Sequence, residues 1–261
     1  MMGKGIIRVL YFSPTHTTRT VVRLTSRILS SELGWPVEET DWTPPDSRET
    51  ELYGETEDLL VLGYPVYAGR VPPLLAEPLS RLKGRGTPAV LEAVYGNRAF
   101  EDALLEGRDI LAGAGFVPIA AGAFIGEHSY SRQVAAGRPD EADLSAVREF
   151  SRQIAEKLRR GSRAEVKVPG TRPYRELSPA NPARPQTTDA CIRCLACVRA
   201  CPKGLIHCED PARVDPGCLH CCACIKACPI GAKAFDDERI RQTTRMLESR
   251  CCTRREPEWF L

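Results

Sequence analysis

Short apolar runs alternate with amphipathic helical patterns over the first 160 residues of the chain. The runs that predict strands are residues 6–12, 37–42, 59–64, 89–95 and 117–125. Apolar residues recur at helical spacing after the first run, at Val21, Leu24 and Ile28, and again between residues 144 and 158. Strands that alternate with helices are typical of a parallel sheet covered on both faces. Residues 1–160 are therefore predicted to form a doubly wound α/β domain with a five-stranded parallel sheet.

This periodicity stops at residue 161. Residues 161–187 contain five prolines, which predict an extended, fairly stiff strap. A small α+β domain is predicted for residues 188–236. Residues 237–261 are predicted to form a helix over 237–249 and then a tail with an apolar end, Trp259, Phe260 and Leu261.

All twelve cysteines lie at or after Cys191. Disulfides of a secreted protein would be spread through the chain, whereas clustered thiolate ligands need a reducing compartment. The cysteine distribution therefore predicts a cytoplasmic protein with a cysteine-ligated centre.

The cysteine pattern C-x2-C-x2-C-x3-C-P occurs twice, in CIRCLACVRACPKG (191–204) and CLHCCACIKACPIG (218–231), with an offset of 27 residues. This run binds [4Fe–4S] clusters in bacterial-type ferredoxins, and its fourth cysteine ligates the other cluster of the pair. The predicted ligands are Cys191, Cys194, Cys197 and Cys228 for cluster 1, and Cys218, Cys221, Cys224 and Cys201 for cluster 2.

Two zinc sites are the alternative, but zinc modules usually carry two separated C-x2-C pairs rather than three cysteines in one turn. Four cysteines fall outside the motif, namely Cys208, Cys222, Cys251 and Cys252. We interpret them as small packing side chains. A redox-active disulfide or a metal site at the vicinal pair Cys251–Cys252 is the alternative.

Charge and hydropathy exclude several function classes. Lys and Arg total 36 against 34 Asp and Glu, a net charge of +2, which argues against a dedicated nucleic-acid surface or a polybasic anchor. No segment reaches the roughly 18 apolar residues that a membrane span needs. The N-terminal residues show no cleavage site for a leader and are interpreted as the approach to the first strand.

A run of hydroxyl residues follows the first predicted strand and leads into a helix. Side-chain hydroxyls and free N–H groups at a helix N-terminus form an anion site that suits a phosphate monoester. The candidate residues are Ser13, Thr15, His16, Thr17 and Thr18. An ordinary helix cap is the alternative for this run alone.

Two further loops follow strands at the same edge, where ligands of open α/β sheets bind. Each combines an aromatic ring with glycine, so that a flat ligand could stack on a side chain and meet bare backbone. Their candidate residues are Pro65, Val66, Tyr67, Ala68 and Gly69 in one loop, and Tyr95, Gly96, Asn97 and Arg98 in the other. The three loops together predict an FMN site.

The chain resembles the fused proteins, found mainly in anaerobes, in which a flavodoxin-like FMN domain precedes a bacterial-type two-cluster ferredoxin. The resemblance covers essentially the whole length. It is carried by YFSPTHTTR, GYPVYAGRVP, VYGNRAFEDALLE, FIGEHSYS, both cysteine motifs and CTRREPEWFL.

The resemblance implies that Ser13, Thr15, Thr17 and Thr18 hold the FMN phosphate. Tyr67 and its neighbours would flank the isoalloxazine, and Gly96 and Asn97 would close its other side. The family usually has glycine where His16 stands, so either the backbone is less free at this position or His16 itself contacts the phosphate.

The function expected from these cofactors is electron transfer between FMN, two [4Fe–4S] clusters and a redox partner protein, since no G-x-G-x-x-G nicotinamide fingerprint is present. An FMN-dependent reductase with a pocket lined by Tyr67, His128 and Tyr130 is the alternative. A cofactor-free N-terminal domain that serves as a scaffold for the ferredoxin is another. The loop 127–130 is interpreted as solvated, with a proton relay as its alternative. The apolar tail is expected to pack on the α/β domain and clamp the small domain so that one cluster faces the flavin.

Overall fold

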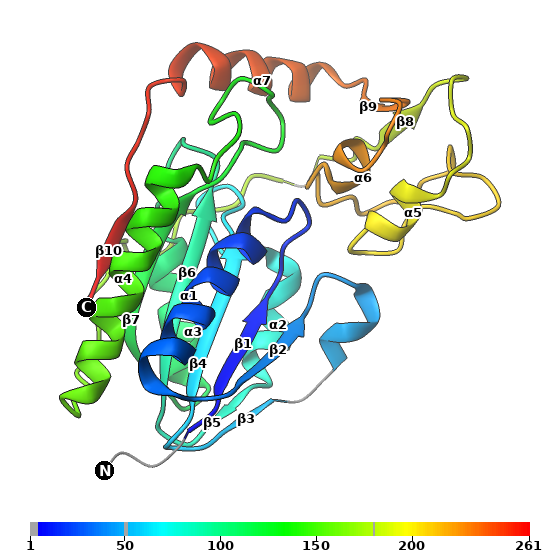
Figure 1. The fold of residues 1–261 in the computed structure, drawn as a ribbon. Helices are drawn as coiled ribbons and strands as arrows, with labels where there is room; N and C mark the ends of the chain where they lie inside the picture. Colours follow the sequence, from blue (N-terminus) through cyan, green and yellow to red (C-terminus); the bar gives the residue numbers. More distant parts are fainter. Residues whose placement is uncertain (1–4, 50–51, 180) are drawn as a thin grey trace.

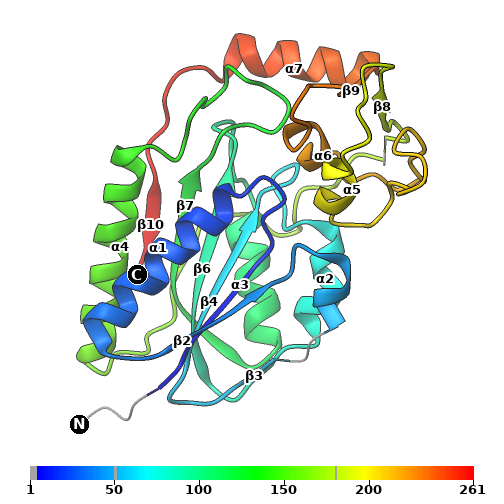
Figure 2. The ribbon, with the colours of Figure 1, turned by 45° about the vertical axis from the view of Figure 1, so that its right-hand side comes forward.

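The computed structural model describes residues 5–49, 52–179 and 181–261. Residues 1–4, to which the prediction about a leader applies, lie outside the described residues. Figures 1 and 2 show an α/β domain with a small cysteine-rich module beyond one end of its sheet. A long helix, α7 (Glu238–Arg250), runs over the same end.

The central sheet has the strand order β10-β7-β6-β4-β1-β2. The strands are β1 (Ile7–Tyr11), β2 (Val37–Asp41), β4 (Leu59–Pro65), β6 (Thr87–Tyr95), β7 (Phe116–Ile125) and β10 (Glu258–Phe260). The five strands from β1 to β7 pair in parallel. Counted in sequence, their order is 2-1-3-4-5, the flavodoxin-like order. The predicted fold class is confirmed.

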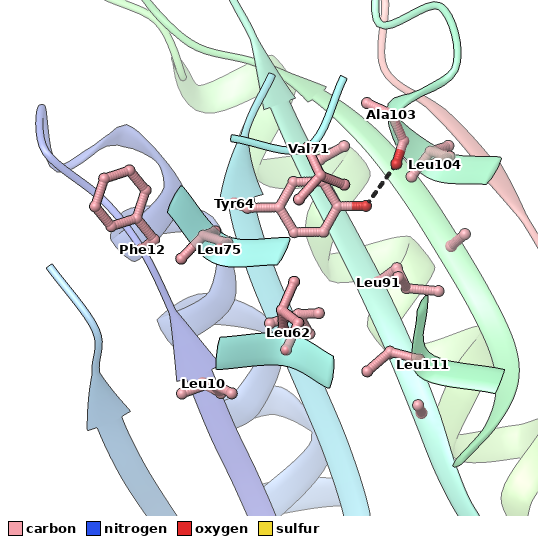
Figure 3. Close-up of a cluster of buried hydrophobic side chains, with 14 of the residues drawn as sticks. Leu10, Phe12, Leu62, Tyr64, Val71, Leu75, Leu91, Ala103, Leu104 and Leu111 are labelled. Atoms are coloured by element: carbon pink, nitrogen blue, oxygen red, sulfur yellow. Dashed lines mark hydrogen bonds between the residues drawn. The ribbon is translucent and has the colours of Figure 1, made fainter. Parts of the chain in front are cut away.

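Helices cover both faces of the sheet, as Figure 2 shows. Helices α1 (Thr17–Leu33) and α4 (Glu141–Arg159) pack on one face, and α2 (Pro73–Ser80) and α3 (Ala103–Gly113) on the other. The central strands are apolar at nearly every position because both of their faces are buried. In the core of Figure 3, the Tyr64 hydroxyl donates to the Ala103 carbonyl at 2.9 Å.

The chain tail adds a sixth, antiparallel strand to the five predicted parallel ones. Strand β10 pairs with β7, with Trp259 opposite Gly122 and Phe260 opposite Ala121. Phe260 packs against the core under α2 and α3, and Trp259 packs on the opposite face. Apolar residues that alternate between faces can extend a sheet edge, so the tail packs on the α/β domain as expected.

Polar contacts fix the segment that leads into β10. The Asn97 side-chain amide donates to the Cys251 and Thr253 carbonyls at 2.6 and 2.8 Å. The buried Arg138 guanidinium donates to the Arg255 carbonyl at 2.8 Å. The segment is thus held to the loop after β6 before it reaches the sheet.

The proline-rich segment lies along α3. The Asp102 carboxylate accepts from the backbone N–H groups of Thr171 and Arg175 at 2.8 and 2.6 Å. Asp109 pairs with Arg172 at 2.6 Å and accepts from the Tyr174 hydroxyl at 2.5 Å. These bonds hold the segment against the domain.

The small module contains α5 (Ala196–Ala200), α6 (Ala223–Lys226) and a two-stranded antiparallel sheet of β8 (Pro185–Thr187) and β9 (Lys233–Phe235). It is tied to the α/β domain by the Arg48 guanidinium, which donates to the Pro202 carbonyl at 2.6 Å. Lys226 also pairs with Glu127 at 2.5 Å. The short elements η1 (Pro45–Glu49), β3 (Tyr53–Gly54) and β5 (Lys83–Gly84) complete the fold.

Among the described residues, no helix is long and apolar enough to span a membrane.

Glu92 is a fully buried carboxyl group at the centre of β6. Its Oε1 accepts from the Thr25 hydroxyl at 2.5 Å, and its Oε2 has no partner among the described residues. Burial raises the pKa of Glu92 from 4.5 to about 8, and the Thr25 hydrogen bond opposes this only in part. Folding therefore favours the protonated form.

We expect Glu92→Gln to flatten the dependence of stability on pH. Because the folded pKa lies above the unfolded one, the stability from Glu92 is fully present below pH 4.5 and is lost as pH rises to about 8. The measurement is the free energy of unfolding in urea at pH 5 and pH 8. This free energy should fall between the two pH values in the parent protein by the contribution of Glu92, and Glu92→Gln should not show that fall. Glu149→Gln, on the exposed side of α4, is the control, and an unchanged slope in Glu92→Gln would contradict the expectation.

Candidate functional site

Five cysteines from both repeats line one small cavity in the module. They are Cys201 from the first motif, Cys218, Cys221 and Cys224 from the second, and the spare Cys222. A second small cavity is lined by Cys191, Cys194 and Cys197 from the first motif and Cys228 from the second. Each cavity therefore contains one predicted group of four, with the fourth cysteine exchanged between the motifs, and Cys222 joins the first group.

The backbone around these cysteines turns N–H groups toward sulfur. The N–H groups of Arg193 and His220 donate to Cys191 Sγ and Cys218 Sγ, both at 3.4 Å. Arg193 and His220 stand at equivalent positions of the repeat and have φ values of 53° and 55°. Each repeat thus uses the same left-handed turn to wrap three thiols around a common centre.

Within the described chain, no group of three or more Cys, His, Asp or Glu side chains lies close enough to share a single metal ion. Burial raises the pKa of Cys221 and of Cys224 to about 12, so their thiolates need a strongly positive partner. Buried thiols with nearby N–H donors fit an iron–sulfur cubane.

The spare cysteines have different surroundings. Cys222 is buried, lines the cluster 2 cavity and has a φ of 60°, like Leu195 at the equivalent position of the first repeat. Cys208 and Cys252 are exposed, and the Cys252 thiol donates to the Glu248 carbonyl at 3.0 Å.

The predicted phosphate loop forms the entrance to α1. His16 is its N-cap residue, with a φ of 68°. His16 therefore adopts the backbone conformation that favours the glycine usual in this family. The Ser13 hydroxyl accepts from the Arg19 N–H at 2.9 Å. The buried Thr18 hydroxyl has no partner among the described residues. An unsatisfied hydroxyl and free N–H groups at a helix start fit a phosphate.

A cavity of about 390 Å³ joins this loop to the cysteine-rich module. The α/β domain lines it with Pro14, Thr15 and His16 and with Asp41, Thr43 and Pro44 at the end of β2. The module lines it with α5 and α6, including Arg199, Cys201 and Lys226. Its volume falls in the range of small-molecule sites. Sequence reasoning missed Asp41, Thr43, Arg199 and Lys226, because neither loop pattern nor spacing relates β2 to the module.

The loop after β4 also reaches the module. Tyr67 is half-buried beside Cys218, Cys221 and Cys222. Burial raises the pKa of its hydroxyl, and the nearby thiols raise it further. Ala68 has a φ of 51°. Gly69 lies against the Glu101 side chain, where an added Cβ would come within 1.8 Å of Oε2. Pro65 and Val66 continue from the strand, and the Val66 N–H donates to the Val94 carbonyl at 2.8 Å.

The loop after β6 makes mainly internal contacts. Gly96 lies against the His128 ring, and the Asn97 amide holds the tail segment. Arg98 pairs with Glu101 at 2.9 Å. Tyr95 is buried and packs edge-on against Phe100. The structure thus places this loop at the predicted sheet edge with its side chains engaged by protein.

The loop 127–130 lies between the α/β domain and the module. Glu127 pairs with Lys226, and His128 Nδ1 accepts from the Tyr130 N–H at 3.1 Å. Burial, then the positive charges of Lys226 and Arg98, lowers the pKa of His128 to about 4. The loop is therefore a domain contact rather than a solvated segment, and His128 is neutral at pH 7.

Residues 186–207 match the family model of the 4Fe-4S binding domain. No curated protein sequence matches the chain. The chain is similar to a flavodoxin from Streptococcus pneumoniae, with 15% identity over 59% of this chain and 99% of that one and a TM-score of 0.40. It is also similar to an archaeal flavodoxin, with 15% identity over 59% of this chain and 99% of that one and a TM-score of 0.42. For a two-electron reduced flavodoxin from Megasphaera elsdenii, the identity is 18% over 56% of this chain and 98% of that one, and the TM-score is 0.36.

The strand order and the family match together define the class of this protein. It combines a flavodoxin-like α/β domain with a [4Fe–4S] ferredoxin-like module.

Proposed function

We propose that this chain is an electron-transfer iron–sulfur flavoprotein that relays electrons between FMN and two [4Fe–4S] clusters. The observation that carries the proposal is the cavity of about 390 Å³, because its walls contain both the phosphate loop and Cys201. When bound, FMN exchanges one or two electrons and each cluster exchanges one, so the pair connects two-electron and one-electron chemistry.

Different residues of the chain would bind the phosphate, the isoalloxazine and the two clusters. Ser13, Thr15, Thr17 and Thr18 hold the phosphate together with the N–H groups that begin α1, where the helix dipole favours an anion. Tyr67 flanks the isoalloxazine on the side of the module. The crossed cysteine sets hold the two clusters.

Cys201, a predicted ligand of cluster 2, lines the cavity, so cluster 2 would be the one that exchanges electrons with the flavin. Cluster 1 serves the redox partner protein. Its ligand Cys194 is exposed. The neighbouring Ile192 and Ile230 are 64% and 45% exposed. Apolar side chains around an exposed ligand provide a docking surface next to the cluster.

An FMN-dependent reductase of a small molecule is the second function considered. It would need an open pocket lined by Tyr67, His128 and Tyr130. The His128 ring packs on Gly96, however, and Tyr67 lies beside the thiols of the module. The observed contacts favour the relay.

The test is an anaerobic redox titration of the purified protein, followed by visible and EPR spectroscopy. We expect about eight iron and eight sulfide per chain, about one FMN, and two cluster signals that titrate separately from the flavin. Zinc without sulfide would refute the clusters. A ferredoxin spectrum without flavin would instead favour the N-terminal domain as a cofactor-free scaffold. Flavin-dependent turnover of a small molecule would favour the reductase.

A further inference from the structure

The cavity beside the phosphate loop is lined by charges of opposite sign on its two sides. The α/β side contributes the Asp41 carboxylate and the His16 imidazole. Burial, then the nearby Arg19 charge, lowers the pKa of His16, so this ring is neutral at pH 7. The module side contributes the Arg199 and Lys226 cations. Among the described lining residues, the full positive charges therefore all come from the module.

The two cations stand at equivalent positions of the internal repeat. Arg199 follows the first cysteine of its motif by eight residues, and Lys226 follows the first cysteine of the second motif by the same number. Arg199 lies in α5 and Lys226 in α6, and these two short helices pack against each other. The packing brings equivalent positions of both repeats to one wall of the cavity.

The two cations differ in their partners. The Arg199 guanidinium donates to a carbonyl oxygen, that of Cys194, at 3.2 Å, and no carboxylate partner is found for it among the described residues. Lys226 pairs with Glu127 at 2.5 Å, and its side chain is 28% exposed. The ammonium group has two further N–H donors to offer.

We propose that Arg199 and Lys226 bind the FMN phosphate, so that the ferredoxin module completes the flavin site of the α/β domain. The inference rests on the proposed function and adds two phosphate-binding residues to it. The start of α1 supplies N–H groups on one side of the phosphate, and the module supplies charge on the other. FMN binding therefore depends on the docked module and on ionic strength. Riboflavin has no phosphate dianion, so its binding does not depend on them.

The experiment uses protein loaded with its clusters and measures flavin release on dilution from the fluorescence of free flavin. We expect Arg199→Gln and Lys226→Gln each to weaken FMN binding by about tenfold, and to reduce its salt dependence, with riboflavin binding unchanged. Arg199→Lys keeps the charge and should restore most of the affinity. Arg213→Gln, at an exposed arginine in the same module that does not line the cavity, is the matched control and should bind FMN like the parent.

Glu127→Gln separates phosphate binding from domain docking. It breaks the same ion pair as Lys226→Gln but leaves the ammonium free. If Lys226 binds the phosphate, Glu127→Gln retains or gains FMN affinity. If the pair only docks the module, both variants lose affinity equally and for riboflavin as well, which overturns the inference. A parent protein that holds FMN with all variants unchanged refutes the inference alone, and a parent that holds no flavin refutes the proposed function too.

Discussion

Cys201→Ser should remove the same cluster as Cys221→Ser, although Cys201 belongs to the first motif. Cys201, Cys218, Cys221 and Cys224 line one cavity, and a cubane that loses one thiolate ligand becomes labile. Iron should fall from about eight to about four per chain. The EPR signal that remains should match in both variants. Cys194→Ser and Cys228→Ser should remove the other signal, since Cys194 and Cys228 line the second cavity.

Cys222→Ser is the matched control for this series. Cys222 is buried beside the cluster 2 ligands, but we assign it no ligand role, so both signals should persist. If Cys201→Ser and Cys194→Ser lose the same signal, each motif holds its own cluster and the crossed assignment is wrong. Loss of a signal in Cys222→Ser would instead make Cys222 a ligand.

Thr17→Asp should abolish FMN binding under ordinary conditions. Thr17 begins α1, and its side chain lies against Gly126 at the end of β7. A carboxylate there would face the phosphate dianion and compete for the same N–H groups, so we expect a loss of more than about 100-fold in affinity. Thr15→Ala removes one hydroxyl and should cost about fivefold. Ultrafiltration of cluster-loaded protein, followed by flavin fluorescence, measures both.

Ser31→Asp provides the control for Thr17→Asp. It adds the same charge to α1 at an exposed position in its last turns, away from the phosphate loop. FMN content should therefore stay at the parent level. Thr17→Asp protein that keeps FMN as tightly as the parent, or a parent that binds riboflavin as tightly as FMN, would show that the phosphate lies elsewhere.

The sequence predicted the α/β sheet because burial on both faces leaves strong apolar runs, such as residues 59–64, in the inner strands. The edge strand β2, with the sequence VEETD, is largely exposed and carries only a weak pattern. It did not predict that residues 258–260 form the sixth strand. Three residues carry too little periodicity to distinguish a strand from a packed tail, and the pairing depends on the exposed edge of β7.

The candidate site shows the same division. Local spacing indicated the two cysteine motifs, and the exchange of the fourth cysteine followed from the known pattern of two-cluster ferredoxins. A local hydroxyl pattern indicated the loop at residues 13–18. Only the tertiary structure showed that the Asn97 amide donates to the tail segment and that the His128 ring lies against Gly96. Side chains near a sheet edge can serve a ligand or a neighbouring segment, and sequence does not distinguish the two.

The sequence alone indicated two domains, the two cysteine motifs and the hydroxyl-rich loop, because each is a pattern of residues close together in the chain. The tertiary structure alone decided that α5 and α6 face the start of α1, and hence that Arg199 and Lys226 share a cavity with His16. That arrangement depends on contacts between distant segments, such as Arg48 with Pro202 and Glu127 with Lys226. Contacts of this kind follow from the shapes of two folded surfaces, which no local pattern encodes.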